Sequence, residues 1–65
     1  MKLTVELIST DNLDRTMVLA INGQRYEYWF QGEVPLEHWR KIHKHNPGRA
    51  LAYIKKLAFK TDKLP

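Results

Sequence analysis

The dipeptide Asn22-Gly23 limits the possible folds of this chain more than any other feature, because it separates two segments whose apolar residues alternate with polar ones. Both residues tolerate the positive φ of a type I′ turn, and a two-residue turn fixes the register of the strands that it joins. That register places Leu19 opposite Tyr26 on one face of the hairpin. Met17 lies opposite Tyr28 on the same face, which is therefore uniformly apolar or aromatic. We predict a β-hairpin with this face turned to the core.

A third strand and two helices complete the predicted order β-β-β-α-α. Residues 2–10 alternate in the manner of a half-buried strand. After the hairpin, Pro35 opens a helix that runs to about His45, and a second helix begins at Pro47 with Asn46 as its N-cap. We expect one small α+β domain over residues 1–65, with a three-stranded antiparallel sheet followed by two helices packed on one face. The polar end, Lys60 to Pro65, is expected to fray.

Size and composition argue against an enzyme. The chain has 65 residues and no cysteine, so neither a disulfide nor a thiolate zinc site can support the fold. A domain of this size buries only about 60 % of its unfolded surface, which leaves little room for an enclosed substrate pocket. The one serine, Ser9, lies at a strand end and not in the surroundings of a nucleophile elbow. We expect no catalytic residue and no cofactor.

The three histidines do not favour a metal site. His38, His43 and His45 lack the i, i+4 spacing that places two ligands on one helical face. His43 adjoins the apolar arc of the first helix and is expected to be a half-buried packing residue. No apolar run approaches the roughly 20 residues of a membrane span, and the first residues contain no apolar stretch typical of a signal peptide. A cytoplasmic protein that does not enter membranes is the resulting expectation.

Charge divides the chain into two unlike parts. Residues 1–37 carry a net charge of −3, whereas residues 38–65 carry eight cations against Asp62 alone, a net charge of +7. Such asymmetry in one small chain points toward a polyanionic partner, most often nucleic acid.

A stripe on the second helix is the first candidate site for that partner. Arg49, Tyr53, Lys56 and Lys60 fall within about 60° of one another on a helical wheel, away from the apolar stripe. The cations would neutralise phosphates and the ring would stack on an unpaired base. In the alternative interpretation, the stripe is a solvated basic face and Tyr53 lies at the edge of the core.

The turn between the helices is the second candidate. A helix start presents free N–H groups, and Gly48 would allow a phosphate to approach closely. Arg49 would act as a forked donor, with Lys44 and His45 beside it. Ordinary capping of the second helix by Asn46 explains the same residues equally well.

The outward face of the hairpin is a candidate protein interface. Thr16, Val18 and Trp29 share this face, and an exposed tryptophan suggests a partner surface. A homodimer through these residues is one expectation. The alternative is that the C-terminal tail, which contains Leu64, covers the face.

Four features of the segment Ile21 to Lys56 occur in a fixed order. They are the aromatic strand Tyr26–Phe30, Val34-Pro35 at the start of a helix, Gly48-Arg49, and Ile54-Lys55-Lys56. In these features the segment resembles the KTSC domain, a small domain found alone in bacterial and phage proteins and at the C-terminus of some lysyl-tRNA synthetases. The resemblance implies a compact sheet-and-helix domain with an RNA or other nucleic-acid role, and it implies no catalytic residue.

These observations lead to two functional hypotheses. The first is a non-enzymatic module that binds nucleic acid, with a preference for RNA, through the basic second helix. The second is a small protein-interaction or inhibitory module, as in phage proteins, which would use the outer hairpin face or the edge strand Leu3–Ile8.

Overall fold

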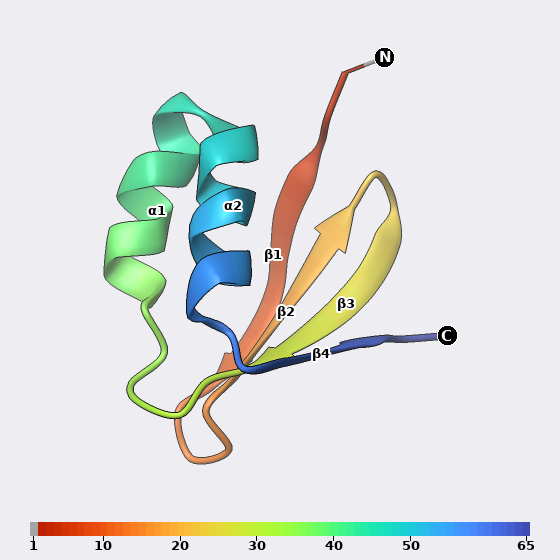
Figure 1. Cartoon of the computed structure of the whole chain (residues 1–65). Helices are drawn as coiled ribbons and strands as arrows, with labels where there is room; N and C mark the ends of the chain where they lie inside the picture. The colour runs from red at the N-terminus through yellow and green to blue at the C-terminus, as the bar shows by residue number, and fades with distance from the viewer. Residues whose placement is uncertain (1) are drawn as a thin grey trace.

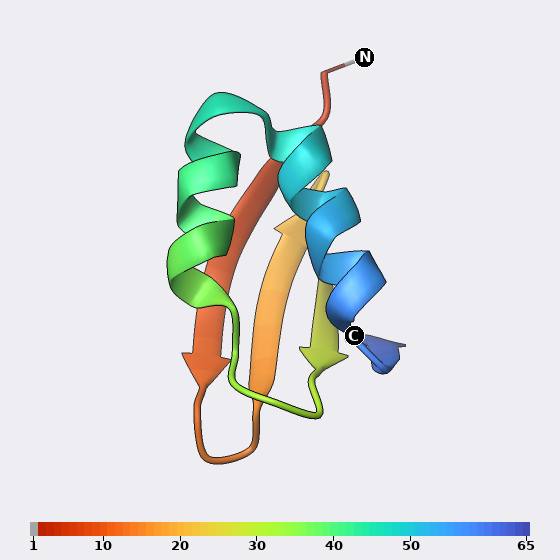
Figure 2. The same cartoon turned by 60° about the vertical axis from the view of Figure 1, so that its left-hand side comes forward.

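The computed structural model describes residues 2–65 as a four-stranded antiparallel sheet with two helices on one of its faces (Figures 1 and 2). The order of strands in the sheet is β1-β2-β3-β4, the same as their order in the chain. The predicted α+β class is confirmed. The elements are β1 (Val5–Asp11), β2 (Thr16–Ile21), β3 (Gln24–Trp29), α1 (Leu36–His45), α2 (Pro47–Leu57) and β4 (Lys60–Lys63).

The C-terminal end is the main departure from the predicted fold, because it does not fray. It forms β4, which pairs antiparallel with β3 and makes the order β-β-β-α-α-β. The Leu64 amide donates to the Arg25 carbonyl at 3.0 Å, and Gln24 Nε2 donates to the Leu64 carbonyl at 2.7 Å. Without β4, one side of β3 would present a row of unpaired backbone groups. All four residues of β4 are exposed, so the strand has no apolar alternation by which a sequence pattern could reveal it.

The central hairpin matches the sequence-based expectation in turn and register. Asn22 has φ 51° and Gly23 has φ 87°, the two positive values that a type I′ turn requires. Leu19 pairs with Tyr26 and Met17 pairs with Tyr28, as predicted.

The first strand begins later than predicted and is irregular. It starts at Val5, which is buried, whereas Leu3 is 37 % exposed. The register with β2 shifts between Leu7 and Ser9, so that Ile8 is an extra residue with no partner on β2. Such a bulge bends a strand and increases its twist, in keeping with the curved sheet in Figure 1. β1 is also an edge strand.

The second helix begins where capping chemistry predicts, whereas the first begins directly after Pro35 without a side-chain cap. Asn46 has extended backbone angles, and its side-chain Oδ1 accepts from the Arg49 amide at 3.1 Å. Pro47 occupies the first helical position, where its missing N–H costs nothing. Pro35 directly precedes α1, and its carbonyl accepts from the Trp39 amide.

Replacing the Asn46 cap should weaken the fold measurably. We expect Asn46→Ala to lower the free energy of unfolding by about 1 kcal/mol, because the Arg49 amide loses its acceptor. Asn46→Asp keeps an acceptor oxygen and should remain close to the wild type. Urea denaturation of the three proteins measures the effect, and equal midpoints for Asn46→Ala and wild type would contradict the assigned cap.

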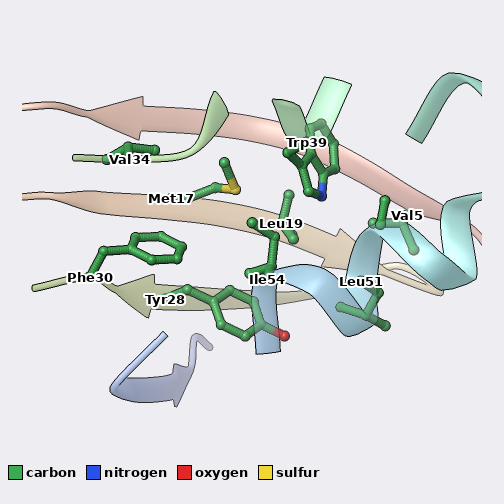
Figure 3. Close-up of a cluster of buried hydrophobic side chains, with 10 residues drawn as sticks. Val5, Met17, Leu19, Tyr28, Phe30, Val34, Trp39, Leu51 and Ile54 are labelled. Atoms are coloured by element: carbon green, nitrogen blue, oxygen red, sulfur yellow. The ribbon is translucent and has the colours of Figure 1, made fainter. Parts of the chain in front are cut away.

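The core lies between the sheet and the helices and contains ten buried apolar residues, of which Figure 3 labels nine. Trp39 of α1 is 1 % exposed and stacks on His43, with ring centroids 4.5 Å apart. His43 Nε2 hydrogen-bonds to the Val5 carbonyl, which ties α1 to the edge strand. His43 is half-buried, so the prediction that it packs at the edge of the core is confirmed. Tyr28 is likewise 1 % exposed.

The buried Tyr28 phenol should make the fold sensitive to alkaline pH. Burial, and then the neighbouring Tyr26, raise the pKa of Tyr28 above its ordinary value. A raised folded-state pKa contributes stability below the unfolded pKa of about 10, and this stability is lost as pH rises through the folded pKa. Above pH 10 we therefore expect wild type to lose stability more steeply than Tyr28→Phe, by at most about 1.4 kcal/mol per pH unit. Parallel pH dependences in urea denaturation would contradict this expectation.

Candidate nucleic-acid interface

The helical layer carries most of the basic side chains of the protein. α1 and α2 together hold six Lys and Arg residues against Glu37 alone, and all six cations are exposed. Within residues 2–65 the one ion pair joins Lys60 and Asp62, which are outside the helices. The six helical cations therefore have no carboxylate partner in the described chain. They are Arg40, Lys41, Lys44, Arg49, Lys55 and Lys56.

The opposite face of the sheet has the opposite character. Residues that lie directly across from each other in an antiparallel pair project from the same face. The register thus places the outward side chains of all four strands on one face of the sheet. The charged side chains on this face are four carboxylates and two cations. The layers are electrostatically distinct, since the basic residues of the helices and the acidic residues of the sheet lie on opposite sides. The outward charged residues are Glu6, Asp11, Arg25, Glu27, Lys60 and Asp62.

Cations from both helices meet at the corner where α1 leads into α2. Lys41 and His45 are four residues apart on α1 and thus lie on one face of it, and Arg49 comes from the first turn of α2. With Ile42 and Asn46 they line a shallow hollow of about 260 Å³. Tertiary packing therefore groups cations that are eight residues apart in the sequence, a suitable arrangement for an anion such as a phosphate.

The turn itself behaves as a cap and not as an open anion site. The Arg49 amide donates to the Asn46 side chain and the Ala50 amide donates to the Asn46 carbonyl, while Pro47 has no N–H. Among the backbone N–H groups at the start of α2, only that of Gly48 is left to donate a hydrogen bond to a ligand. A Cβ atom built on Gly48 would lie 3.5 Å from the Leu3 side chain, so Leu3 occupies part of the predicted close approach.

Tyr53 contacts the first helix. Its ring lies 5.0 Å from the His38 ring, centroid to centroid, at an angle of 52°, and it is half-buried. This position agrees with the interpretation that Tyr53 packs between the helices at the edge of the core. A ring held in this way offers less surface to an unpaired base than the predicted stacking platform.

The placement of Lys60 on the basic stripe of the second helix is wrong. α2 ends at Leu57, and Lys60 is the first residue of β4. Its Nζ lies 5.0 Å from the centroid of the Trp29 ring, on the outer face of the sheet, and 3.9 Å from Asp62. The helix stops because the chain must turn at this point to pair with β3, as the Phe59 amide does with the Trp29 carbonyl.

The outer hairpin face presents less apolar surface than its sequence suggests. Thr16 is 6 % exposed, and Val18 and Trp29 are half-buried. The backbone of the C-terminal segment pairs at the edge of β3, and of its side chains Lys60 lies over Trp29 on this face. A homodimer through this face stays a prediction.

The sequence analysis named Lys44 and His45 of α1 as site residues but did not include Arg40 and Lys41 of the same helix. Arg40 and Lys41 share the outward arc of α1 with Lys44, and this arc is visible on a helical wheel. The helical wheel does not show on which side of α1 the second helix packs, and it therefore does not show that the cations of the two helices lie together.

Among residues 2–65, no group of three or more potential metal ligands is close enough to hold an ion.

Comparison with known proteins gives no relative: no family model, no curated protein and no solved structure matches the chain. The resemblance to the KTSC domain therefore stays a prediction. Neither helix in the described part of the chain has the length and apolar content needed to cross a membrane.

Proposed function

We propose that this protein is a non-enzymatic module that binds nucleic acid through one surface of its helical layer. The proposal rests on the lysine and arginine side chains of α1 and α2. They are exposed on the side opposite the acidic face of the sheet, and none has a carboxylate partner in the described chain. The basic helical surface is defined here as Arg40, Lys41, Lys44, His45, Arg49 and Lys56.

The physical reason is the release of counterions. A polyanion such as RNA or DNA is surrounded by condensed cations, and Lys and Arg side chains that neutralise phosphates set these cations free. Two neighbouring helices spread such side chains over a surface wider than one helix. The acidic outer face of the sheet would repel the same ligand, so the charge distribution also orients the protein on it.

Recognition by this surface would rest on phosphates more than on bases. Tyr53 packs against His38, and Trp29 lies on the acidic side beneath Lys60. Neither ring stands open in the basic helical surface for stacking. We therefore propose binding with little sequence preference, to duplexes as well as to single strands. The stacking of Tyr53 on an unpaired base and the preference for RNA that the KTSC resemblance implies are not part of the proposal.

Titration of the purified protein with short fluorescent RNA and DNA at about 50 and 200 mM salt tests the proposal. Binding should weaken steeply with salt, since each phosphate contact contributes roughly 0.7–0.9 to the slope of log K against log salt. Absence of binding at about 50 mM salt, where such contacts are strongest, would overturn the proposal.

The edge of β1 favours a second candidate function, a protein-interaction module. β1 has seven residues and neither lysine nor proline, whereas β4, at the other edge, carries Lys60 and Lys63. Lysine residues and short length discourage an edge strand from pairing with other chains. β1 has neither feature and is protected only by Glu6, Asp11 and the bulge at Ile8. Ile8, the bulge residue of β1, is 39 % exposed. An extended segment of a partner would add to β1 by backbone hydrogen bonds, and Ile8→Lys should abolish that pairing.

A further inference from the structure

A second concave site lies on the other flank of α2, between this helix and the strands β3 and β4. It is a cleft of about 360 Å³, lined by Ile21, Tyr26, Tyr28, Lys55 and Thr61. The volume falls within the range of pockets that hold small molecules. The cleft exists because β4 extends the sheet beyond the area that the helix pair covers (Figure 1). None of its lining residues belongs to the basic helical surface.

The floor of the cleft is largely apolar. Tyr26 and Tyr28 are two residues apart on β3 and therefore project from the same face of the sheet. Tyr28 is buried in the core, whereas Tyr26 is half-buried, so its ring keeps part of its surface free. Ile21, at the end of β2, completes the apolar part. Aromatic rings of this kind stack on planar groups of a ligand.

The rim of the cleft supplies hydrogen-bond donors and positive charge. Lys55 contributes an ammonium group from α2, and Thr61 contributes a hydroxyl group from β4. Lys63 pairs with Tyr26 in the register of β3 and β4, so its side chain projects from the same face of the sheet. No carboxylate lines the cleft. An apolar floor with cationic donors at its edge matches a ligand with a flat apolar body and an anionic group.

We propose that this cleft binds a small organic anion that carries a planar ring. The ring would lie on Tyr26 and against Ile21, and the anionic group would contact the Lys55 ammonium group and the Thr61 hydroxyl group. Two sources supply this chemistry, a mononucleotide and an aromatic carboxylate. The proposal does not depend on nucleic-acid binding by the basic helical surface, because the two sites share no residue.

Adjacent lysines of α2 provide a matched pair of variants. Lys55 lines the cleft, whereas Lys56 belongs to the basic helical surface, and both are exposed. Lys55→Gln should weaken binding of the anion by up to about fivefold, the upper end of the range for an exposed ion pair. Lys56→Gln removes the same charge one residue away and should leave this binding unchanged. For salt-dependent binding of nucleic acid we expect the reverse: Lys56→Gln should weaken it and Lys55→Gln should leave it nearly unchanged. The two proposals can therefore fail separately.

The experiment is titration of the isotope-labelled protein, followed by amide chemical shifts, with adenosine 5′-monophosphate and with indole-3-acetate. Inorganic phosphate and adenosine serve as probes that have only the anion or only the ring. At least one ring-bearing anion should shift the Tyr26, Lys55 and Thr61 amides and bind more tightly than either partial probe. Whichever ring-bearing anion binds identifies the source.

Several results would overturn the proposal. One such result is the absence of amide shifts at the cleft at ligand concentrations up to about 10 mM, because a dissociation constant above this value is too weak for a specific site. Equal effects of Lys55→Gln and Lys56→Gln on the affinity for the ring-bearing anion are another. Tyr26→Leu keeps an apolar side chain without the flat ring and should weaken binding of this anion severalfold. If Tyr26→Leu does not fold, the comparison of Lys55→Gln with Lys56→Gln still tests the proposal.

Discussion

Tyr28→Ala is expected to unfold the protein at ordinary temperatures. The Tyr28 ring is 1 % exposed in the centre of the core, and removal of a buried aromatic ring costs about 3–5 kcal/mol. A chain of this size rarely has more than roughly 3–5 kcal/mol of total stability, so the loss equals most or all of what holds the fold. Thermal unfolding followed by circular dichroism measures the effect.

Tyr28→Phe is the matched control for this prediction. It keeps the ring that fills the core and should preserve a cooperative transition at neutral pH. An alanine variant that melts at the same temperature as wild type would show that the faces of β3 are assigned the wrong way round.

The triple variant Lys41→Gln, Arg49→Gln and Lys56→Gln should lose much of the salt dependence of nucleic-acid binding. These residues come from both helices and lie in the basic helical surface. If each contacts a phosphate, the slope of log K against log salt becomes shallower by about 2 to 3, since one contact contributes roughly 0.7–0.9. Binding at low salt should weaken equally for RNA and DNA duplexes. Fluorescence titration over a range of salt concentrations measures the slope.

A second triple variant removes the same number of cations from elsewhere. Lys2, Arg25 and Lys60 lie outside the helices, and their replacement by glutamine lowers the net charge by the same amount. This control should change the slope far less. Circular dichroism checks that both variants fold, as expected for exposed side chains. Equal slopes for the two folded triple variants would mean that binding reflects net charge and not the helical surface.

Those parts of the fold that depend on residues close together in the chain could be predicted from the amino-acid sequence. Asn22-Gly23 adopts the positive φ values of its turn, and a two-residue turn leaves the flanking strands one register. Asn46 caps α2 through an amide three residues away. The apolar arc of α1 buries Trp39. Each of these features follows from a contact within one turn or one hairpin, and such contacts are visible in a short stretch of sequence.

The candidate sites could be predicted only in part, for the same reason. The excess of cations in residues 38–65 is a property of composition, and the exposure of Arg49 and Lys56 follows from the helical period. The grouping of Lys41 with Arg49 depends on how α1 and α2 pack against each other. The contact between Tyr53 and His38 also depends on how the two helices pack. Because of this contact Tyr53 packs against α1, whereas the helical wheel indicated a ring free to stack on a base.

The course of the C-terminal segment depends on contacts between parts of the chain that are far apart in sequence. Residues 60–63 are polar and exposed, and no periodicity marks them as a strand. They form one because the free edge of β3, more than thirty residues earlier in the chain, offers backbone groups that need partners. This pairing moves Lys60 to the acidic face of the sheet and creates the cleft beside Lys55. Backbone hydrogen bonds do not depend on side-chain type, so the sequence pattern carries no signal of them.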